Sequence, residues 1–300
     1  MFGLDTSLHA AVPKHFSGFR STSEWEIPPW ELTIDRCTLL GRGSFADVYM
    51  GTWRHTPVVV KVFNAYSLQQ KEELIQREIH IMTKLHHPNI VQVLGFMRDP
   101  FVIVMECMQG GDLLKNLKAL RTKDKLHIMR DCLRALCYLH NRHPESLMHR
   151  DIKLSNILLT RSKHAKIADF GLSRLTRGLV YNSSNNDLEH KGTLLNSETE
   201  LTQPIGTERY KAPEMPCTTY TNKIDIYALG ICMYELFEST RYQPSEGFLW
   251  DRTPRNLRAF MLTNMLCPVP IERKTAVECL TEFDSLVEAH AMRCPCFCVG

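Results

Sequence analysis

The spacing of hydrophobic residues changes part-way along the chain. Between residues 32 and 105, runs such as 58-VVVKVF-63 are β-branched and bounded by turn formers, which predicts strands. One interruption, 67–85, has apolar positions three and four residues apart and predicts a single amphipathic helix. Helical spacing then recurs in three later stretches: 113–142, 223–238 and 274–288. We therefore expect an α+β protein with a strand-rich lobe and a helix-rich lobe, joined near Met108.

Both ends of the chain and one internal stretch lack such periodicity. Residues 1–31 are expected to form an extended lead-in, pinned to the domain surface by three apolar side chains: Trp25, Ile27 and Trp30. The polar stretch 176–203 is long for a loop in a compact domain, which indicates a functional or a disordered insert. Residues 288–300 form a cysteine-rich tail, for which acylation, metal binding and an inert end are alternatives; its cysteines are Cys294, Cys296 and Cys298.

Composition narrows the classes of function. The formal net charge of +3 argues against a protein that binds nucleic acid mainly through a positively charged surface. The hydrophobic share of 44% is that of a globular protein, and no apolar run reaches the roughly 18 residues of a transmembrane helix. The first ten residues do not resemble a secretory signal. Eleven cysteines without C-x-x-C pairs favour reduced thiols and a cytoplasmic protein, with weak membrane association through an acylated tail as an alternative.

The first candidate for chemistry is the run 41-GRGSFADV-48. Gly41 and Gly43 lack side chains, so backbone N–H groups there can approach a phosphate, although the same spacing also marks an ordinary tight hairpin. Ala46 stands where a third glycine would be expected, and no phosphate-loop lysine follows. The strand-like continuation at Val48 argues against a dinucleotide-binding enzyme, in which a helix would follow the glycines.

Two charged residues occur within hydrophobic patterns. Lys61 interrupts a β-branched strand, and Glu78 lies on or beside the apolar stripe of the predicted helix. Each has an ordinary alternative as a solvent-facing side chain. Because an unpaired buried charge is costly, we expect the two residues to form an ion pair.

Two further segments combine oxygen-bearing side chains with neighbouring strands. In 149-HRDIKLSNILL-159, Asp151 and Asn156 lie five positions apart, ahead of an apolar run. In 169-DFG-171, Asp169 follows a strand-like run, so its carboxylate would lie at a turn and could meet a metal ion. Alone, this tripeptide would indicate only a turn.

In this order and at these spacings, the motifs resemble those of the eukaryotic protein kinase family. The resemblance covers residues 32–287 and includes 206-GTERYKAPE-214 and Arg273, which matches the family's partner of Glu214. It implies a bilobal protein kinase fold, with a small antiparallel β-sheet lobe, one helix and a larger helical lobe. The implied bounds are 32–105 for the first lobe, 106–112 for the hinge and 113–287 for the second lobe.

The resemblance implies transfer of a phosphoryl group from ATP to Ser or Thr hydroxyls of protein substrates, assisted by Mg²⁺. Asp151 would accept the proton of the hydroxyl, and Lys153 would balance charge on the transferred group. Lys61, oriented by Glu78, would hold the phosphates. Two oxygen-bearing side chains would ligate Mg²⁺: Asn156 and Asp169.

Adenine is implied to bind between the lobes. Met105 matches the gatekeeper position at the rear of that site, and Glu106 and Met108 match the hinge residues that hydrogen-bond the base. Core packing is the ordinary alternative for the apolar members of this set. The complete nucleotide-binding set is Leu40, Gly41, Gly43, Val48, Val59, Lys61, Met105, Glu106, Met108 and Leu158.

The subtype and its regulation follow from the same resemblance. Lys153 and Thr207 match serine/threonine kinases, and the phrases 25-WEIPPWEL-32 and 225-DIYALGICMYEL-236 look most like the tyrosine-kinase-like group. Arg150 is typical of kinases that an upstream kinase activates by phosphorylation. The candidate positions are Thr202, Thr199, Ser197 and Thr207, with a hydrated polar loop as the alternative.

One alternative function and one departure remain. A pseudokinase scaffold would have the same fold and little turnover, although every group needed for the chemistry is present. The stretch between Glu238 and Arg273 is short for the family, so its substrate-docking surface departs from the pattern more than its chemistry does. The substrate, the pathway and the oligomeric state do not follow from the sequence.

Overall fold

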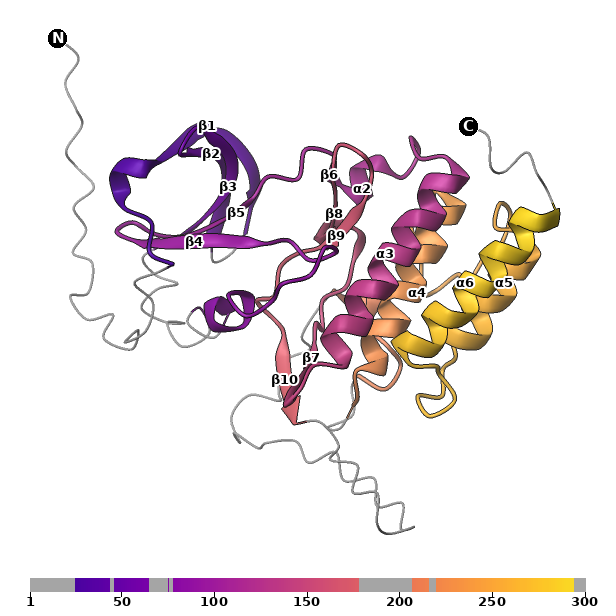
Figure 1. Cartoon of the computed structure of the whole chain (residues 1–300). Coiled ribbons are helices and arrows are strands. Elements are labelled where there is room, and N and C mark those ends of the chain that lie inside the picture. The colour runs from indigo at the N-terminus through magenta and orange to yellow at the C-terminus, as the bar shows by residue number, and fades with distance from the viewer. Residues whose placement is uncertain are drawn as a thin grey trace. The chain divides into compact units, whose positions relative to one another are not determined.

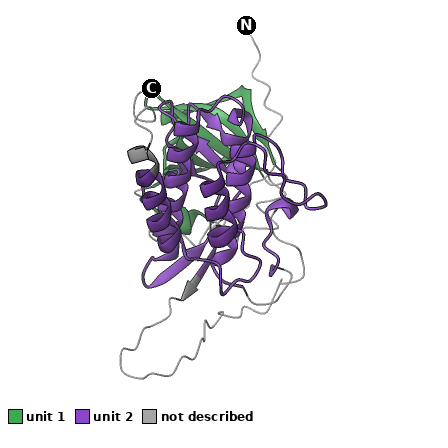
Figure 2. Cartoon of the chain, turned by 90° about the vertical axis from the view of Figure 1, so that its right-hand side faces the viewer, with its two compact units in different colours: residues 1–86, 92–107 green, residues 87–91, 108–300 purple. Residues whose placement is uncertain are grey.

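The computed structural model describes residues 25–43, 46–64, 75, 78–177, 207–215 and 220–293. The chain divides into two compact units, shown in green and purple in Figure 2. Unit 1 comprises Met1–His86 and Gln92–Cys107, and unit 2 comprises His87–Val91 and Met108–Gly300. Each unit is described in turn.

Unit 1 contains a five-stranded antiparallel sheet in the order β1-β2-β3-β5-β4 (Figure 1). Its core lies on one face, where Val58 and Val60 of β3 are fully buried and pack with Val102 and Val104 of β5. Alternation along the strands places these β-branched side chains on the same face, as the sequence pattern predicts. The strands are β1 (Leu32–Arg42), β2 (Ala46–Trp53), β3 (Thr56–Phe63), β4 (Val93–Arg98) and β5 (Phe101–Glu106).

The helix predicted over 67–85 is present in unit 1 for the part that the structure describes. Residues 75 and 78–82 are helical, and a turn follows at 83–84. Ile75, Ile79 and Met82 are buried, as the apolar stripe predicts. The residues expected to begin the helix, including Ser67, lie outside the described part of the chain.

The described part of the lead-in, residues 25–31, is bonded to the sheet, but it is not extended throughout. The Phe96 N–H donates to the Trp25 carbonyl, and the Ile27 N–H donates to the Phe96 carbonyl. Ile27 is buried, which confirms its predicted anchoring role. The prediction for Trp30 is wrong, because Trp30 is 84% exposed and lies in a 3-10 turn, η1 (Pro29–Glu31). Proline favours the first position of a helical turn, so Pro29 begins the turn instead of prolonging the strand.

Helices account for most of the regular secondary structure in the described part of unit 2. In α4, every residue from Ile224 to Glu238 is buried, as its nearly continuous apolar sequence predicts. Both α4 and α6 pack against α3 (Figure 1). The helices predicted over 113–142 are present as α2 and α3. The helices are α2 (Leu113–Asn116), α3 (Thr122–His140), α4 (Lys223–Glu238), α5 (Arg255–Phe260) and α6 (Ala276–Arg293), with a π-helical segment, η4 (Met261–Met265), after α5.

Two small sheets in unit 2 hold the loops that carry the candidate chemistry. One has the order β6-β8-β9, and the other pairs β7 with β10. Gly110 lies directly before β6 and donates its N–H to the Leu159 carbonyl; a Cβ at this position would lie 2.6 Å from the Thr160 oxygen, so only glycine fits. The strands are β6 (Gly111–Asp112), β7 (Glu145–Met148), β8 (Ile157–Leu159), β9 (Ala165–Ile167) and β10 (Arg174–Arg177).

Among the described residues, no helix combines the length and apolar character needed to cross a bilayer.

Candidate active site

In unit 1, Lys61 and Glu78 form an ion pair. The Lys61 Nζ lies 2.7 Å from the Glu78 Oε1, and the Glu78 side chain is 6% exposed. β3 carries the lysine, and the helical residues 78–82 carry the carboxylate. The predicted pairing is confirmed, and it fixes an ammonium group at a defined position on the sheet.

The apolar residues predicted to contact adenine in unit 1 share the sheet face that carries Lys61. Val48 of β2 lies opposite Lys61, and Met105 of β5 lies opposite Val59. Because residues directly opposite each other point to one face, these four side chains lie on the face away from the buried core of Val58 and its neighbours. They are partly buried, whereas Leu40 is exposed. The arrangement is an apolar surface with one cation in it.

The glycine-containing loop joins β1 to β2. Gly43 donates its N–H to the Ala46 carbonyl at 3.0 Å, and a Cβ on Gly43 would lie only 3.0 Å from that oxygen. Ala46, at the position of the missing third glycine, is buried within β2. An alanine is therefore accommodated there as an ordinary strand residue.

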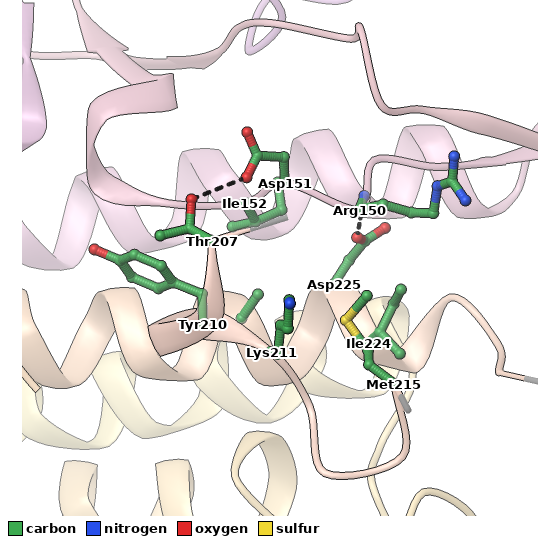
Figure 3. Close-up of a pocket in the computed structure, with 10 residues that line it drawn as sticks. Arg150, Asp151, Ile152, Thr207, Tyr210, Lys211, Met215, Ile224 and Asp225 are labelled. Atoms are coloured by element: carbon green, nitrogen blue, oxygen red, sulfur yellow. Dashed lines mark hydrogen bonds between the residues drawn. The ribbon is translucent and has the colours of Figure 1, made fainter. Parts of the chain in front are cut away.

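In unit 2, a carboxylate with several polar contacts lies in the loop between β7 and β8. The Asp151 Oδ2 accepts hydrogen bonds from the Lys153 Nζ at 2.7 Å and from the Asn156 Nδ2 at 3.0 Å. The Thr207 hydroxyl lies 3.4 Å from the Asp151 Oδ1 (Figure 3). Asp151 is only 8% exposed, so these contacts hold its side chain in one orientation.

A second buried carboxylate, Asp225, holds the backbone of this loop. It accepts the His149 N–H at 2.9 Å and the Arg150 N–H at 2.8 Å, and it lies 2.9 Å from the His140 Nε2. Arg150 has a positive φ of 66°, an unfavourable backbone conformation that these bonds help to maintain. Burial alone would raise the pKa of Asp225, but the hydrogen bond and charge of His140 outweigh it and hold the pKa below its ordinary value.

Sequence analysis did not identify Asp225 as a site residue. The signal in the sequence was an aspartate close to the start of the almost wholly apolar segment 223–238, and in the structure Asp225 is buried. A buried carboxylate requires hydrogen-bond donors, and here two of them are backbone amides of the candidate catalytic loop. Which donors it meets depends on tertiary structure.

His149 contacts both of the loops that carry the candidate metal ligands, Asn156 and Asp169. Its Nε2 is 3.1 Å from the Ala168 carbonyl, and its Nδ1 is 3.3 Å from the Asp151 N–H. A neutral imidazole satisfies both contacts, with Nε2–H donating and Nδ1 accepting. His149 is fully buried, and burial lowers its pKa against the attraction of nearby aspartates.

We expect the stability of the protein to fall when the pH is lowered below about 6.5, the ordinary pKa of histidine. Burial lowers the pKa of His149 in the folded protein, so below this pH the unfolded chain binds a proton at His149 and the folded protein does not. Acid therefore favours unfolding until the pH reaches the lowered pKa. The free energy of unfolding, measured in urea between pH 7.5 and 5, should depend less on pH in His149→Phe. The exposed residue His127 supplies the control, His127→Phe, which should keep the wild-type dependence. Equal pH dependence in all three proteins would contradict this account.

The oxygen donors predicted to ligate Mg²⁺ belong to neighbouring turns. The Ala168 N–H donates to the Asn156 carbonyl at 2.8 Å, which brings the start of 169-DFG-171 beside Asn156. Asp169 is exposed and has a φ of 65°, whereas Phe170 is buried with its ring 4.8 Å from that of His149. The Asn156 Nδ2 bonds Asp151, so the amide oxygen of Asn156 is the atom available to a cation.

This donor set fits Mg²⁺ bound together with phosphates. Magnesium commonly takes one or two protein oxygens and completes its shell with phosphate oxygens and water. Within the described part of the chain, no cluster of three or more His, Cys, Asp or Glu residues forms an all-protein metal site. Asn156 and Asp169 offer one amide oxygen and one carboxylate, which are oxygen ligands of the kind that Mg²⁺ prefers.

A buried ion pair joins the segment after Thr207 to the end of the helical unit. Arg273 is fully buried and donates to both carboxylate oxygens of Glu214, at 2.6 and 3.1 Å. It also donates to the carbonyls of Lys223 and Cys267, and its guanidinium lies 5.0 Å from the centre of the Tyr227 ring. The predicted pairing of Glu214 with Arg273 is confirmed.

The remaining predicted residues have mixed outcomes. The Glu106 N–H donates to the Gln92 carbonyl, and Met108 accepts the Gly111 N–H; these bonds define the hinge backbone without testing adenine binding. Leu158 lies in β8 of unit 2 and is partly buried.

Arg150 donates to the Leu172 carbonyl and to the Tyr220 hydroxyl. The candidates Thr202, Thr199 and Ser197 lie outside the described residues, as do Cys294, Cys296 and Cys298.

Comparison with known proteins identifies the family. The model of the protein kinase domain matches residues 34–283. This chain belongs to the protein kinase family. The predicted family and its fold, an antiparallel sheet with one helix and a helical unit, are thus confirmed.

Several curated kinases are similar to this kinase. The serine/threonine-protein kinase VIK of Arabidopsis thaliana is 37% identical over 226 residues, which cover 72% of this chain and 48% of VIK. The human serine/threonine-protein kinase TNNI3K is 32% identical, over 76% of this chain and 25% of TNNI3K. The dual specificity protein kinase pyk3 of Dictyostelium discoideum is 30% identical, over 89% of this chain and 20% of pyk3. The chain thus spans about half the length of VIK and less of the other two.

Proposed function

We propose that this kinase transfers the terminal phosphoryl group of ATP to Ser and Thr hydroxyls of protein substrates. The observation that carries the proposal is the Asp151 carboxylate, held by Lys153, Asn156 and the Thr207 hydroxyl. Serine/threonine kinases among the relatives support the acceptor type. The sequence phrases 25–32 and 225–236 support a place in the tyrosine-kinase-like group.

Asp151 is proposed as the base that receives the proton of the acceptor hydroxyl. Its Oδ2 faces two donors, and its Oδ1 has the longer contact with Thr207, so Oδ1 is the oxygen that an incoming hydroxyl can reach. Lys153 bonds the same carboxylate and supplies positive charge where negative charge develops during transfer. Asn156 fixes the carboxylate through its amide nitrogen. Geometry of this kind favours transfer by positioning the reactants.

Lys61 is proposed to bind phosphate oxygens of ATP. Its ion pair with the buried Glu78 holds the ammonium in place, and the positive charge of this group would attract the phosphate oxygens. Asn156 and Asp169 are proposed to hold Mg²⁺, which would neutralise part of the phosphate charge. Val48, Val59, Met105 and the hinge residues are proposed to receive the adenine.

Replacing Lys61 with methionine is expected to lower kcat/KM for ATP about a hundredfold or more, because a fixed charge on the phosphates is lost. Methionine preserves the length and much of the volume of the side chain. The matched control is Lys115→Met, since Lys115 lies on the surface in α2 and its side chain is 75% exposed. Steady-state kinetics with varied ATP would measure both variants. Wild-type kinetics in Lys61→Met would exclude this role.

One experiment tests the function as a whole. The protein is incubated with ATP, Mg²⁺ and a mixture of Ser/Thr and Tyr peptides, and the modified residues are mapped by mass spectrometry. We expect phosphate on Ser and Thr, and loss of turnover when EDTA removes Mg²⁺. Phosphate confined to Tyr would overturn the acceptor type. No incorporation with any acceptor would instead support the pseudokinase scaffold. Mapping the protein itself would also test Thr202, Thr199, Ser197 and Thr207 as targets of autophosphorylation or of an upstream kinase.

A further inference from the structure

A buried carboxylate with two arginine partners lies in unit 2. Glu235, in the last turn of α4, is fully buried and accepts hydrogen bonds from the Tyr210 hydroxyl at 2.6 Å and the Tyr242 N–H at 2.9 Å. Its Oε1 also lies 3.1 Å from the Arg241 Nε and 3.5 Å from the Arg209 Nη1. Four donors therefore surround one carboxylate, which leaves it closed to an external cation.

The charges of this group do not balance. Two guanidinium groups and one carboxylate leave one net positive charge. The side chains of Arg209 and Arg241 are 26% and 37% exposed, and neither has a second carboxylate partner among the residues that the structure describes. A guanidinium group carries five N–H donors. Arg209 and Arg241 each contact Glu235 through one nitrogen only. Both groups thus retain donors for a further anion.

The cluster of Glu235, Arg209 and Arg241 lies beside Asp151, the proposed base. Arg209 belongs to η3 (Glu208–Tyr210), which begins directly after Thr207, and the Tyr210 N–H donates to the Thr207 carbonyl. Tyr210 lines one pocket together with Asp151 and Thr207 (Figure 3). The neighbouring Lys211 is neutralised, because it lies 2.6 Å from the Glu208 carboxylate.

We propose that this kinase selects acidic acceptor segments, in which Asp or Glu side chains near the accepting Ser or Thr pair with Arg209 and Arg241. The proposal rests on the proposed phosphoryl transfer and names its substrate class. Arginine binds carboxylates through two parallel hydrogen bonds, which gives both charge and geometric selection. A basic segment would meet an uncompensated positive charge and find Glu235 already occupied.

Arg241 also forms part of the wall of a cleft of about 580 Å³. The other charged residues of the cleft are Lys118, Glu238, Glu246, Asp251 and Arg252. Glu238 is occupied by loop donors at Asp251, Arg252 and Thr253. Cations and carboxylates are equal in number there, so the cleft provides room beside Arg241 for more of a peptide and adds no preference for charge. The selectivity is assigned to Arg209 and Arg241.

The test uses three labelled peptides with the same Ser/Thr acceptor, flanked on both sides by Glu, by Gln or by Arg. Binding is measured by fluorescence anisotropy without ATP, and kcat/KM is measured with ATP and Mg²⁺. We expect the Glu peptide to exceed the Gln peptide about tenfold in both measurements, and the Arg peptide to rank last. Because the interaction is between partly exposed charges, raising the salt concentration should reduce this ratio.

Variants of the two arginines decide whether they carry the preference. In Arg209→Gln and Arg241→Gln, the Glu-to-Gln peptide ratio should fall, and in the double variant it should come within about twofold of one. Arg209→Lys and Arg241→Lys keep the charge near Glu235 but lose the paired hydrogen bonds, so they should retain part of the preference, between wild type and the Gln variants, and they guard against misfolding. Arg161→Gln, at an exposed turn between β8 and β9, should leave the ratio unchanged.

The outcomes separate this inference from the proposed function. Equal binding and equal kcat/KM for the three peptides, or a ratio unaffected by the double variant, would overturn the acidic preference while phosphoryl transfer stands. Selective binding of the Glu peptide without phosphorylation of any acceptor would overturn the proposed function while the arginine surface stands.

Discussion

Replacing Asp151 with asparagine is expected to lower kcat about 10²- to 10⁴-fold, the usual contribution of a general base. Asparagine keeps the shape of the side chain and can still bond Asn156 and Thr207, but it cannot take the proton of the acceptor hydroxyl. Binding of ATP should change little, because the proposed role concerns the acceptor alone. Steady-state kinetics with varied ATP and varied peptide would separate the two effects.

The control for Asp151→Asn is Asp99→Asn, at an exposed turn between β4 and β5. This variant should keep wild-type kcat, and urea denaturation should show that both variants are folded. Turnover of Asp151→Asn within about threefold of wild type would show that Asp151 is not the base. Removal of Lys153 would then be the next test of the same loop, because its ammonium lies 2.7 Å from Asp151.

The second large effect concerns stability. Replacing Arg273 with methionine is expected to lower the free energy of unfolding by about 3–5 kcal/mol, the usual cost of removing one partner of a buried ion pair. The loss arises because the Glu214 carboxylate and the carbonyls of Cys267 and Lys223 lose the donors of the fully buried Arg273. Equilibrium unfolding in urea would measure it, provided that the transition is two-state.

A double-mutant cycle identifies the source of this loss. If Glu214 is the main partner, Glu214→Gln combined with Arg273→Met should cost less than the sum of the single changes. The exposed Arg161→Met should change stability by less than about 0.5 kcal/mol, as surface substitutions usually do. A loss below about 1 kcal/mol for Arg273→Met would mean that hydrophobic packing replaces the pair at little cost.

One of the site's pairings could be predicted because the sequence places two opposite charges within apolar patterns, where an unpaired charge is costly. Lys61 and Glu78 occur within apolar patterns, and each charge needs an opposite partner to be buried at low cost. The same reasoning applied to Asp225 would have predicted a buried carboxylate, but it could not have identified the His149 and Arg150 amides as its donors. The backbone N–H groups that will donate such bonds cannot be recognised from the amino-acid sequence.

The departures have local causes. Trp30 was expected to anchor the lead-in because it is aromatic, but Pro29 begins a 3-10 turn and leaves the ring exposed. The helices predicted over 113–142 are confirmed as α2 and α3, but their apolar spacing did not show that the first would end at Asn116. Hydrophobic spacing reports which residues are buried and does not by itself report where the backbone changes direction.

The division into strand-rich and helix-rich parts, the family, and the residues that carry the proposed chemistry could all be read from the order of the amino acids. These follow from periodicity and from short motifs, which are local along the chain. The contacts between groups far apart in the chain depend on how the elements pack, such as Thr207 with Asp151, Asp225 with the amides of the catalytic loop, and two arginines with Glu235. The reason is physical: a buried polar group needs a partner, but many donors could serve, and the packing of the helices selects one.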